Sequence, residues 1–147
     1  MADAKADCIF CKIVGGKIGS SGVYEDAHVL AFLDVNPASK GHLLVIPKKH
    51  YEQITDIPDT ELAHLAKATR ELSRALRTST KCDGCNIIQN NGKAAGQLIF
   101  HSHFHIIPRF KDDHLQIRWV ARLAYDGEEE KEKYRKMIGD AMRQKKL

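Results

Sequence analysis

Three histidines alternate along one short stretch of the chain, at His101, His103 and His105. Successive side chains of an extended strand point to opposite faces, so the three imidazoles are predicted to share one face. The residues that back onto the other face are Ser102, Phe104 and Ile106. The pattern therefore predicts a row of titratable nitrogens with apolar residues beneath it.

Imidazoles in such a row suit chemistry at phosphorus. The ordinary pKa of histidine, about 6.5, leaves one ring nitrogen unprotonated near pH 7, and this nitrogen is a nucleophile that forms a labile bond to phosphorus. Imidazole also binds zinc, copper and iron, but three ligands at alternate strand positions spread over roughly 13 Å and do not converge on one ion. The pattern favours nucleophilic catalysis over a metal site built from all three histidines.

The composition favours one domain that handles small anions. A chain of 147 residues with 43% hydrophobic content is long enough to bury one core. The net charge of +4 is scattered along the chain, without a basic stripe interleaved with aromatic residues. This favours an anionic small molecule as partner over a nucleic-acid polymer.

The sequence also bears on the cellular compartment. No stretch approaches the roughly 20 consecutive apolar residues of a membrane helix, and the first seven residues lack the apolar run of a signal peptide. We therefore expect a soluble protein without membrane contact, in the cytoplasm or the nucleus. There the four cysteines are expected to be reduced thiols or metal ligands rather than disulfides.

Apolar runs and turn residues predict a mainly antiparallel sheet. Val29–Leu33 and His42–Ile46 are typical of neighbouring strands joined by the turn at 36–41. Asn86–Asn90 and Leu98–Pro108 are predicted to form a second strand pair around the loop 91–96. A further short apolar segment runs from Ile9 to Val14 and ends at two glycines.

Two stretches have the spacing of amphipathic helices. Between about residues 58 and 79, apolar side chains recur at intervals of three and four, which predicts a helix across one face of the sheet. The charged tail at 127–147 has apolar residues spaced in the same way and is predicted to be a surface helix. The fold class is therefore α+β, with helices packed on an antiparallel sheet.

Several separated motifs together resemble the histidine-triad (HIT) family of nucleotide hydrolases and transferases. The central motif is His101-Ser-His-Phe-His-Ile-Ile, preceded by Asn90-Asn-Gly and Ala95-Gly-Gln and followed by Pro108-Arg. Upstream blocks agree in order and spacing: Cys8-Ile-Phe-Cys-Lys-Ile, Ala31-Phe-Leu-Asp and Gly41-His-Leu-Leu-Val-Ile-Pro-Lys-Lys-His. The resemblance spans residues 7 to 110 and suggests the zinc-bearing, adenosine 5′-monophosphoramidase-like branch.

The resemblance implies an organisation as well as a fold. It implies a HIT-like antiparallel sheet of about five strands with a long helix packed on it, and a homodimer that joins two sheets edge to edge. We expect a flexible N-terminus at 1–7, the HIT domain at 8–110 and a C-terminal extension with a helix at 111–147.

The resemblance also assigns catalytic roles. His103 is the expected nucleophile, which attacks the α-phosphorus of a nucleoside 5′-phosphate derivative to give a nucleotidyl-histidine. His105 and His42 are expected to bind or protonate the phosphate and the leaving group. His42 begins a different strand, so its convergence with the other two is an expectation from the family fold.

The resemblance also implies nucleotide-binding residues, which are matched to this sequence one position at a time. Asp34 matches the ribose ligand, because a carboxylate can accept both vicinal hydroxyl protons. Asn90 and Gln97 can donate amide hydrogens to phosphate, with backbone amides near Leu98 adding more. The positions that match the apolar wall around the base are Ile9, Phe10, Ile13, Phe32 and Val35, any of which could instead be ordinary core.

Leu98 departs from the family pattern. The nucleoside-phosphoramidate branch commonly has a serine there that can hydrogen-bond the reacting or leaving group, and leucine has no side-chain donor. Specificity for phosphoramidates is therefore unsupported at this position.

In zinc-bearing members of the family, the thiol pair matched by Cys8 and Cys11 is completed by the residues matched by His50 and His101. The resemblance thus implies a closed structural Cys₂His₂ zinc site, which would fix the strand carrying His103. The alternative is that both thiols are merely buried. The second pair, Cys82 and Cys85, has no family counterpart, and we interpret it as one turn cysteine and one core cysteine.

The leading hypothesis is a hydrolase of purine nucleoside 5′-phosphoramidates or related nucleoside monophosphate conjugates, acting through a nucleotidyl-histidine without a magnesium requirement. One alternative is a nucleotide-binding regulatory or scaffold protein with marginal catalysis. Others are a dinucleoside polyphosphate hydrolase and a zinc-dependent hydrolase.

Overall fold

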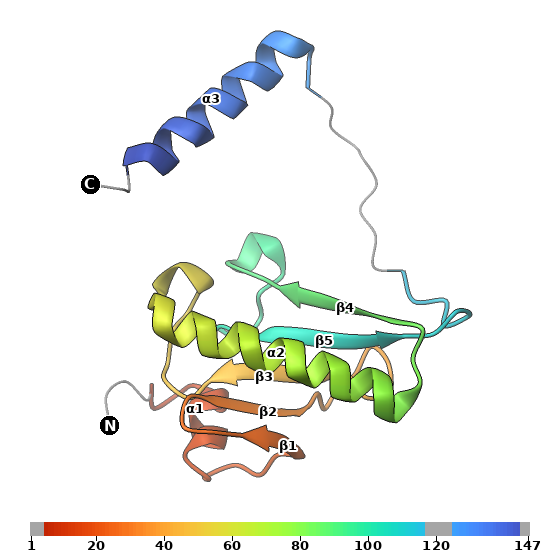
Figure 1. The fold of residues 1–147 in the computed structure, drawn as a ribbon. Coiled ribbons are helices and arrows are strands. Elements are labelled where there is room, and N and C mark those ends of the chain that lie inside the picture. The colour runs from red at the N-terminus through yellow and green to blue at the C-terminus, as the bar shows by residue number, and fades with distance from the viewer. Residues whose placement is uncertain (1–4, 117–124, 145–147) are drawn as a thin grey trace. The chain divides into compact units, whose positions relative to one another are not determined.

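The fold is a five-stranded antiparallel sheet with a long helix packed on it, which confirms the predicted α+β class (Figure 1). A computed structural model describes residues 5–116 and 125–144. The strands are β1 (Gly22–Glu25), β2 (Val29–Leu33), β3 (Leu43–Pro47), β4 (Gly84–Gln89) and β5 (Phe104–Arg109). Their order in the sheet is β1-β2-β3-β5-β4, and each neighbouring pair is antiparallel.

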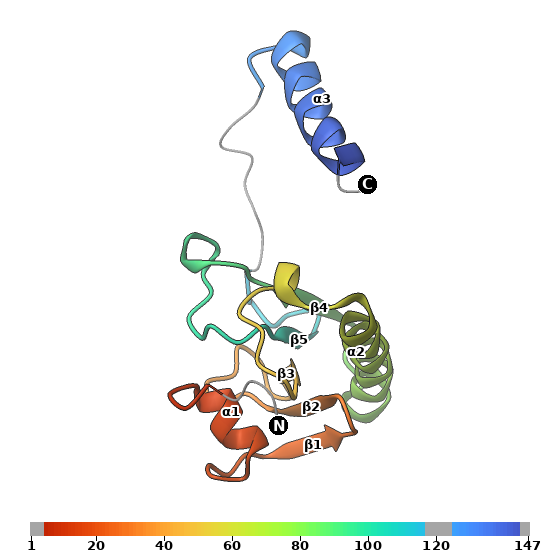
Figure 2. The same ribbon diagram turned by 90° about the vertical axis from the view of Figure 1, so that its left-hand side faces the viewer.

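Both faces of the central strands are covered by apolar side chains. Alternate residues of the strands, such as Val29 and Val45, pack against the leucines of helix α2 (Asp59–Thr80). The residues between them, such as Leu30 and Leu44, form a second cluster with Phe10 of helix α1 (Ile9–Val14). Figure 2 shows α1 and α2 on opposite sides of the sheet. Because both faces are buried, β2 and β3 are continuous hydrophobic runs rather than alternating ones.

The two strongest sequence patterns are confirmed. The predicted strand Val29–Leu33 has the bounds of β2, and the helix predicted at 58–79 is α2. The strand predicted from His42 begins one residue later, at Leu43. The apolar segment at Ile9–Val14 is helical, with one buried side that includes Phe10.

The prediction of a strand over Leu98–Pro108 is wrong in its first half, because β5 begins only at Phe104. Residues 98–103 leave the sheet and find other partners. The backbone N–H of Ser102 donates to the carbonyl of Tyr51 (2.6 Å), in the segment that follows β3. Residues 101–103 are all buried, so the alternation between buried and exposed residues of a half-covered strand is absent there as well.

Strand β1 was not identified from sequence patterns. All four of its residues are exposed, because it lies at the edge of the sheet. An exposed edge strand lacks the alternation between buried and exposed residues on which such a prediction depends.

The described chain divides into a first unit that ends at Leu115 and a second that begins at Gln116. The second unit contains the predicted C-terminal helix, α3 (Glu128–Gln144). Of the predicted flexible N-terminus, residues 1–4 lie outside the described residues, as do 117–124 and 145–147 of the predicted extension. Across the described residues, no helix combines the length and the hydropathy needed to cross a membrane.

Candidate active site and metal centre

The three alternating histidines form a row on the face of the sheet that carries α1. The Phe10 ring lies edge-on to two of them, with centroids 5.7 Å from His101 and 5.3 Å from His103. The ring of His105 follows 4.9 Å beyond His103. The backing residues Phe104 and Ile106 pack in the cluster under α2. The shared face predicted from the spacing is therefore present, although only His105 belongs to a strand.

One backbone carbonyl fixes the protonation of His103. The Nδ1 atom of His103 lies 2.7 Å from the carbonyl oxygen of His101, and a carbonyl only accepts hydrogen bonds. Nδ1 therefore carries the proton in the neutral ring, and Nε2 keeps a free lone pair. Burial lowers the pKa of His103, against the smaller raising effects of this hydrogen bond and of Asp34. His103 is thus neutral at pH 7, with Nε2 available as a nucleophile.

A second chain of hydrogen bonds fixes His42 and His105. The backbone N–H of Ala38 donates to Nδ1 of His42 (3.1 Å), so the proton of the neutral His42 ring is on Nε2. Nε2 of His42 donates in turn to Nδ1 of His105 (2.9 Å), which leaves the His105 proton on its own Nε2. Burial lowers the pKa of both rings, that of His105 to about 4. His105 therefore presents a neutral N–H donor.

The one carboxylate of this group is Asp34, just after β2. Its Oδ1 accepts the backbone N–H of Asn36 (2.9 Å), and its Oδ2 lies 3.7 Å from Nε2 of His42. Its charge raises the pKa of His42, although burial outweighs this effect. Asp34 and His42 therefore lie at the His105 end of the histidine row.

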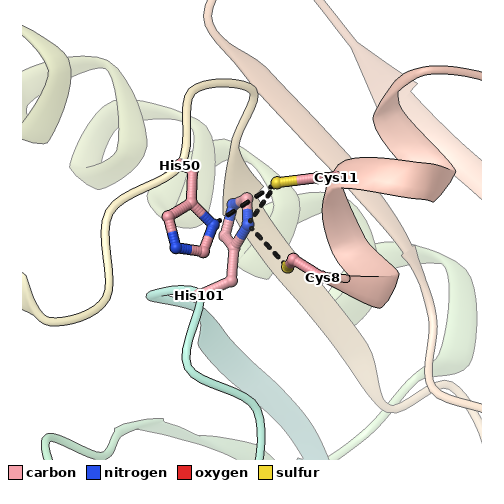
Figure 3. A group of neighbouring side chains, drawn as sticks. All are labelled: Cys8, Cys11, His50 and His101. Atoms are coloured by element: carbon pink, nitrogen blue, oxygen red, sulfur yellow. Dashed lines mark hydrogen bonds between the residues drawn. The ribbon is translucent and has the colours of Figure 1, made fainter. Parts of the chain in front are cut away.

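Four potential metal ligands meet at the opposite end of the histidine row, around His101. Their donor atoms all lie within 4.8 Å of one another: Cys8, Cys11, His50 and His101 (Figure 3). Sγ of Cys11 lies 3.3 Å from Nδ1 of His50 and 3.6 Å from Nδ1 of His101, and Sγ of Cys8 lies 3.5 Å from the same nitrogen of His101. The four residues come from three distant segments, so only folding assembles them.

The donor set fits a tetrahedral Cys₂His₂ zinc site. Nε2 of His101 donates to the carbonyl of Pro47 (2.8 Å), which leaves the Nδ1 lone pair directed at the thiols. Nε2 of His50 is instead buried without a hydrogen-bond partner. A hydrogen bond to the protein therefore fixes the orientation of His101, whereas Nε2 of His50 has no such bond. Burial raises the pKa of Cys11, and a metal would offset that cost by stabilising the thiolate.

The histidine triad does not form a common metal site in the described residues. His101 belongs to the Cys/His group, whereas His105 belongs to a separate group with Asp34 and His42. Cys82 and Cys85 take no part in either group, and Cys85 packs in the core under α2.

The residues expected to surround the base divide into two sets. Phe10 and Phe32 are buried and pack edge to face, with centroids 5.6 Å apart, and Ile13 packs beside them. Ile9 and Val35 are exposed. The buried pair is thus part of the second core cluster, and the exposed pair is available to a ligand.

The expected role of Gln97 needs correction. Its side chain is buried, and Nε2 donates to the carbonyls of Glu52 (2.6 Å) and Ile99 (3.1 Å), while Oε1 accepts the N–H of Gly92 (2.7 Å). Both amide hydrogens are therefore used within the protein. Gln97 anchors the loop rather than offering its side chain to a phosphate. Asn90 lies half-buried at the start of this loop.

Sequence reasoning missed the groups that orient the histidines. The sequence indicates Phe10 only as a candidate for the apolar wall around the base, and neither the carbonyl of His101 nor the N–H of Ala38 is among the predicted site groups. For Ala38 a signal was available, since a turn with Asn36-Pro37 immediately precedes His42. Backbone carbonyls carry no such signal, because every residue has one.

The fold and this site define an antiparallel α+β domain with a row of three histidines and an adjoining Cys/His group. The chain belongs to the HIT family, because the family model described as HIT domain matches residues 16–112. A HIT-like protein of Methanocaldococcus jannaschii is 54% identical over 106 residues, which cover 72% of this chain and 81% of that protein.

Other relatives carry functional names. An adenosine 5′-monophosphoramidase of Candida albicans is 38% identical over 122 residues, covering 79% of this chain and 80% of that protein. An adenylylsulfatase of Arabidopsis thaliana is 45% identical over 107 residues, covering 73% of this chain and 54% of that protein.

Solved structures share the fold. A Streptococcus mutans protein aligns with a TM-score of 0.84 at 44% identity, covering 98% of this chain and 88% of that one. A zinc-bound histidine triad protein of Mycobacterium smegmatis aligns with a TM-score of 0.72 at 42% identity, covering 78% of this chain and 83% of that one.

We predict that zinc content depends on the Cys/His group and not on cysteine in general. Cys11→Ser is expected to lose bound zinc and to unfold at a lower temperature, because a structural metal contributes binding free energy to folding. Metal analysis and thermal unfolding measure both effects. Cys85→Ser is the matched control and is expected to retain zinc. Equal zinc content in the two variants would contradict the assignment.

We predict that stability falls as the pH drops from 6.5 towards 4. Burial lowers the pKa of His105 from 6.5 to about 4, so between these values the unfolded chain binds a proton that the folded protein does not. This contribution to stability is complete above the pKa of His105 in the unfolded chain, 6.5, and is lost below its pKa in the folded protein, about 4. Urea unfolding at pH 7 and at pH 4.5 measures this, and His105→Asn is expected to show a weaker pH dependence. If stability depends on pH equally in the wild type and in His105→Asn, the pH dependence does not come from His105.

Proposed function

We propose that the protein is a nucleotide hydrolase that cleaves purine nucleoside 5′-phosphoramidates or related nucleoside monophosphate conjugates through a nucleotidyl-histidine at His103. The observation that carries this proposal is the hydrogen bond from Nδ1 of His103 to the His101 carbonyl, because it leaves Nε2 unprotonated. Family membership and the names of the phosphoramidase and adenylylsulfatase relatives support the class of substrate.

The reaction would proceed in two displacements. Nε2 of His103 attacks the α-phosphorus, a bond from phosphorus to Nε2 forms, and the bond to the leaving nitrogen breaks. The leaving nitrogen takes up a proton from solvent and departs as ammonia or an amine. A water molecule then attacks phosphorus, releases the nucleoside monophosphate from Nε2 and returns a proton to solvent.

The neighbouring groups would stabilise the phosphate. The hydrogen bond from His42 keeps the proton of the neutral His105 ring on Nε2. This N–H can therefore donate a hydrogen bond to a developing negative charge without prior protonation of the ring. Asp34 would accept the ribose hydroxyls. Asn90 and the backbone amides near Leu98 would bind phosphate, and Ile9 and Val35 would contact the base, with Phe10, Ile13 and Phe32 behind them.

Zinc would be structural rather than catalytic. Cys8, Cys11, His50 and His101 would hold it, and with four protein ligands the coordination sphere is closed. When bound, the metal supplies a rigid support for the segment that carries His101, whose carbonyl orients the nucleophile. No magnesium ion is required in this scheme, because His103 needs no metal to attack.

A second candidate function is nucleotide binding for regulation, with marginal catalysis. It is favoured by Leu98, which offers no side-chain donor near the reacting groups. Hydrolysis of dinucleoside polyphosphates would use the same nucleophile with a different leaving group.

Replacing His103 by asparagine is expected to reduce the turnover of adenosine 5′-phosphoramidate by about a thousandfold or more while AMP binding changes little, because the nucleophile is lost and the pocket is kept. Steady-state kinetics and calorimetry measure the two quantities. The matched control is His64→Asn on α2, outside the histidine row, which is expected to retain activity. Turnover undiminished in His103→Asn would reject the proposal.

We further propose a homodimer through the β4 edge. Within the described residues β4 pairs only with β5, and Ile87 on it is 51% exposed beside a hollow between β4 and α2. An exposed apolar sheet edge favours association. Ile87→Arg is expected to convert a dimer into a monomer in analytical ultracentrifugation, with Val23→Arg on β1 as the control. A monomeric wild type would disprove the proposal.

A further inference from the structure

Helix α2 and the edge strand β1 border two adjoining hollows. One has a volume of about 350 Å³ and the other of about 220 Å³. Val23, Leu72 and Ala75 line both, so the two hollows form one groove between the helix and the strand, which we call the α2/β1 groove. On α2 it extends from His64 to Thr80. The histidine row lies on the opposite face of the sheet, with α1, so the groove is separate from the candidate active site (Figure 2).

The groove lies beside an open edge of the sheet. β1 is the first strand in the sheet order, and within the described residues it pairs only with β2 (Figure 1). All four of its residues are exposed. An open edge offers backbone N–H and C=O groups to a further strand. Because side chains alternate between the two faces of a sheet, such a strand would direct every second side chain towards α2, into the groove.

Small side chains on the helix keep the groove open. α2 packs on the sheet through leucines such as Leu65 and Leu72, but Ala68 and Ala75 line the groove beside them. Across from these alanines Val23 is 52% exposed, and the pairing of β1 with β2 is irregular at this residue. Such a bulge re-aims a side chain, and here the side chain lines both hollows. The groove is therefore an apolar surface that the described part of the chain leaves uncovered.

Lys67 gives the groove a charge that is available to a partner. The carboxylate of Asp26 accepts hydrogen bonds from the Tyr24 hydroxyl (2.7 Å) and from two backbone N–H groups. Oε1 of Glu71 pairs with Arg74 (3.0 Å). In the part of the chain that the structure describes, Lys67 has no carboxylate partner of its own. The groove is thus complementary to a partner that carries a carboxylate beside its apolar groups.

An extended peptide matches the strand edge, the two hollows and the charge together. Same-face side chains of a strand are roughly 6.6 Å apart, so two of them can enter adjoining hollows. Main-chain hydrogen bonds to the edge strand would give such a complex its affinity, and the hollows would give it specificity.

We propose that the α2/β1 groove binds an extended segment of another protein. This segment pairs with β1, places apolar side chains at alternate positions in the two hollows and directs a carboxylate at Lys67. The inference does not depend on the proposed hydrolase activity, because the groove shares no residue with the histidine row or the Cys/His group.

A library of random linear peptides displayed on phage and selected against the zinc-loaded full chain tests this inference. Enriched peptides are expected to carry apolar residues at alternate positions and an acidic residue close to them. Fluorescence polarisation with the synthetic peptides then measures the dissociation constants for the wild type and for variants. Hydrogen exchange is expected to slow at Tyr24 and Glu25 when a peptide binds, and to stay unchanged at Ile87 on β4.

Ala75→Phe fills the junction of the two hollows from an exposed position on α2. It is expected to weaken peptide binding about tenfold or more, because an apolar side chain of the peptide loses its place in the groove. Ala63→Phe is the matched control, since Ala63 is also an exposed alanine of α2 but does not line the groove, and it is expected to bind as the wild type does.

Lys67→Glu tests the charge without changing the shape of the hollows. It is expected to weaken binding of the acidic peptides about twofold to fivefold, since an exposed ion pair contributes little. Lys17→Glu makes the same change of charge outside the groove and is expected to have no effect.

Enrichment of no peptide would overturn the inference, as would equal affinity of the enriched peptides for the wild type and for Ala75→Phe. Analytical ultracentrifugation without peptide tests the alternative occupant. If Ala75→Phe lowers the oligomeric state there, the groove holds a second copy of this chain, and the inference is overturned.

Discussion

The hydrogen bond between Nδ1 of His103 and the carbonyl of His101 is the interaction on which the candidate site depends. It sets the tautomer of His103, and its geometry is set by the residue whose ring also belongs to the Cys/His group. The ring of His101 is in turn held by the carbonyl of Pro47 at the end of β3. His101 thus links the Cys/His group, the sheet and His103, so disorder at His101 would reach all three.

Burial on both faces of the sheet makes this arrangement possible. A neutral imidazole is favoured where water is excluded, and α1 with Phe10 excludes water from one side of the row while α2 covers the opposite face of the sheet. Burial also obliges every polar group to find a partner. Backbone groups at Ala38, Pro47 and Tyr51 meet that need for His42, for His101 and for the N–H of Ser102.

The sequence predicted the elements whose hydrophobic pattern is strong. Strand β2 and helix α2 bury apolar faces of regular period, so their bounds follow from the pattern. Strand β1 lies exposed at the sheet edge and has no such pattern. At Leu98–His103 the pattern of a strand is present but the hydrogen-bond partners are not those of a ladder. Side-chain alternation alone does not reveal which carbonyl a backbone amide will find.

For the candidate site, the sequence alone determined residue types and spacing: three alternating imidazoles, a Cys-x-x-Cys pair and a carboxylate after an apolar strand. These fix which chemistry is available. Tertiary structure decided which ring nitrogen of His101 is free, that His42 meets His105, and that Gln97 anchors a loop instead of presenting its amide. The reason is physical, because a tautomer or a side-chain hydrogen bond depends on partners such as Pro47 and Glu52, which lie dozens of residues away along the chain and come within 3 Å only when it folds.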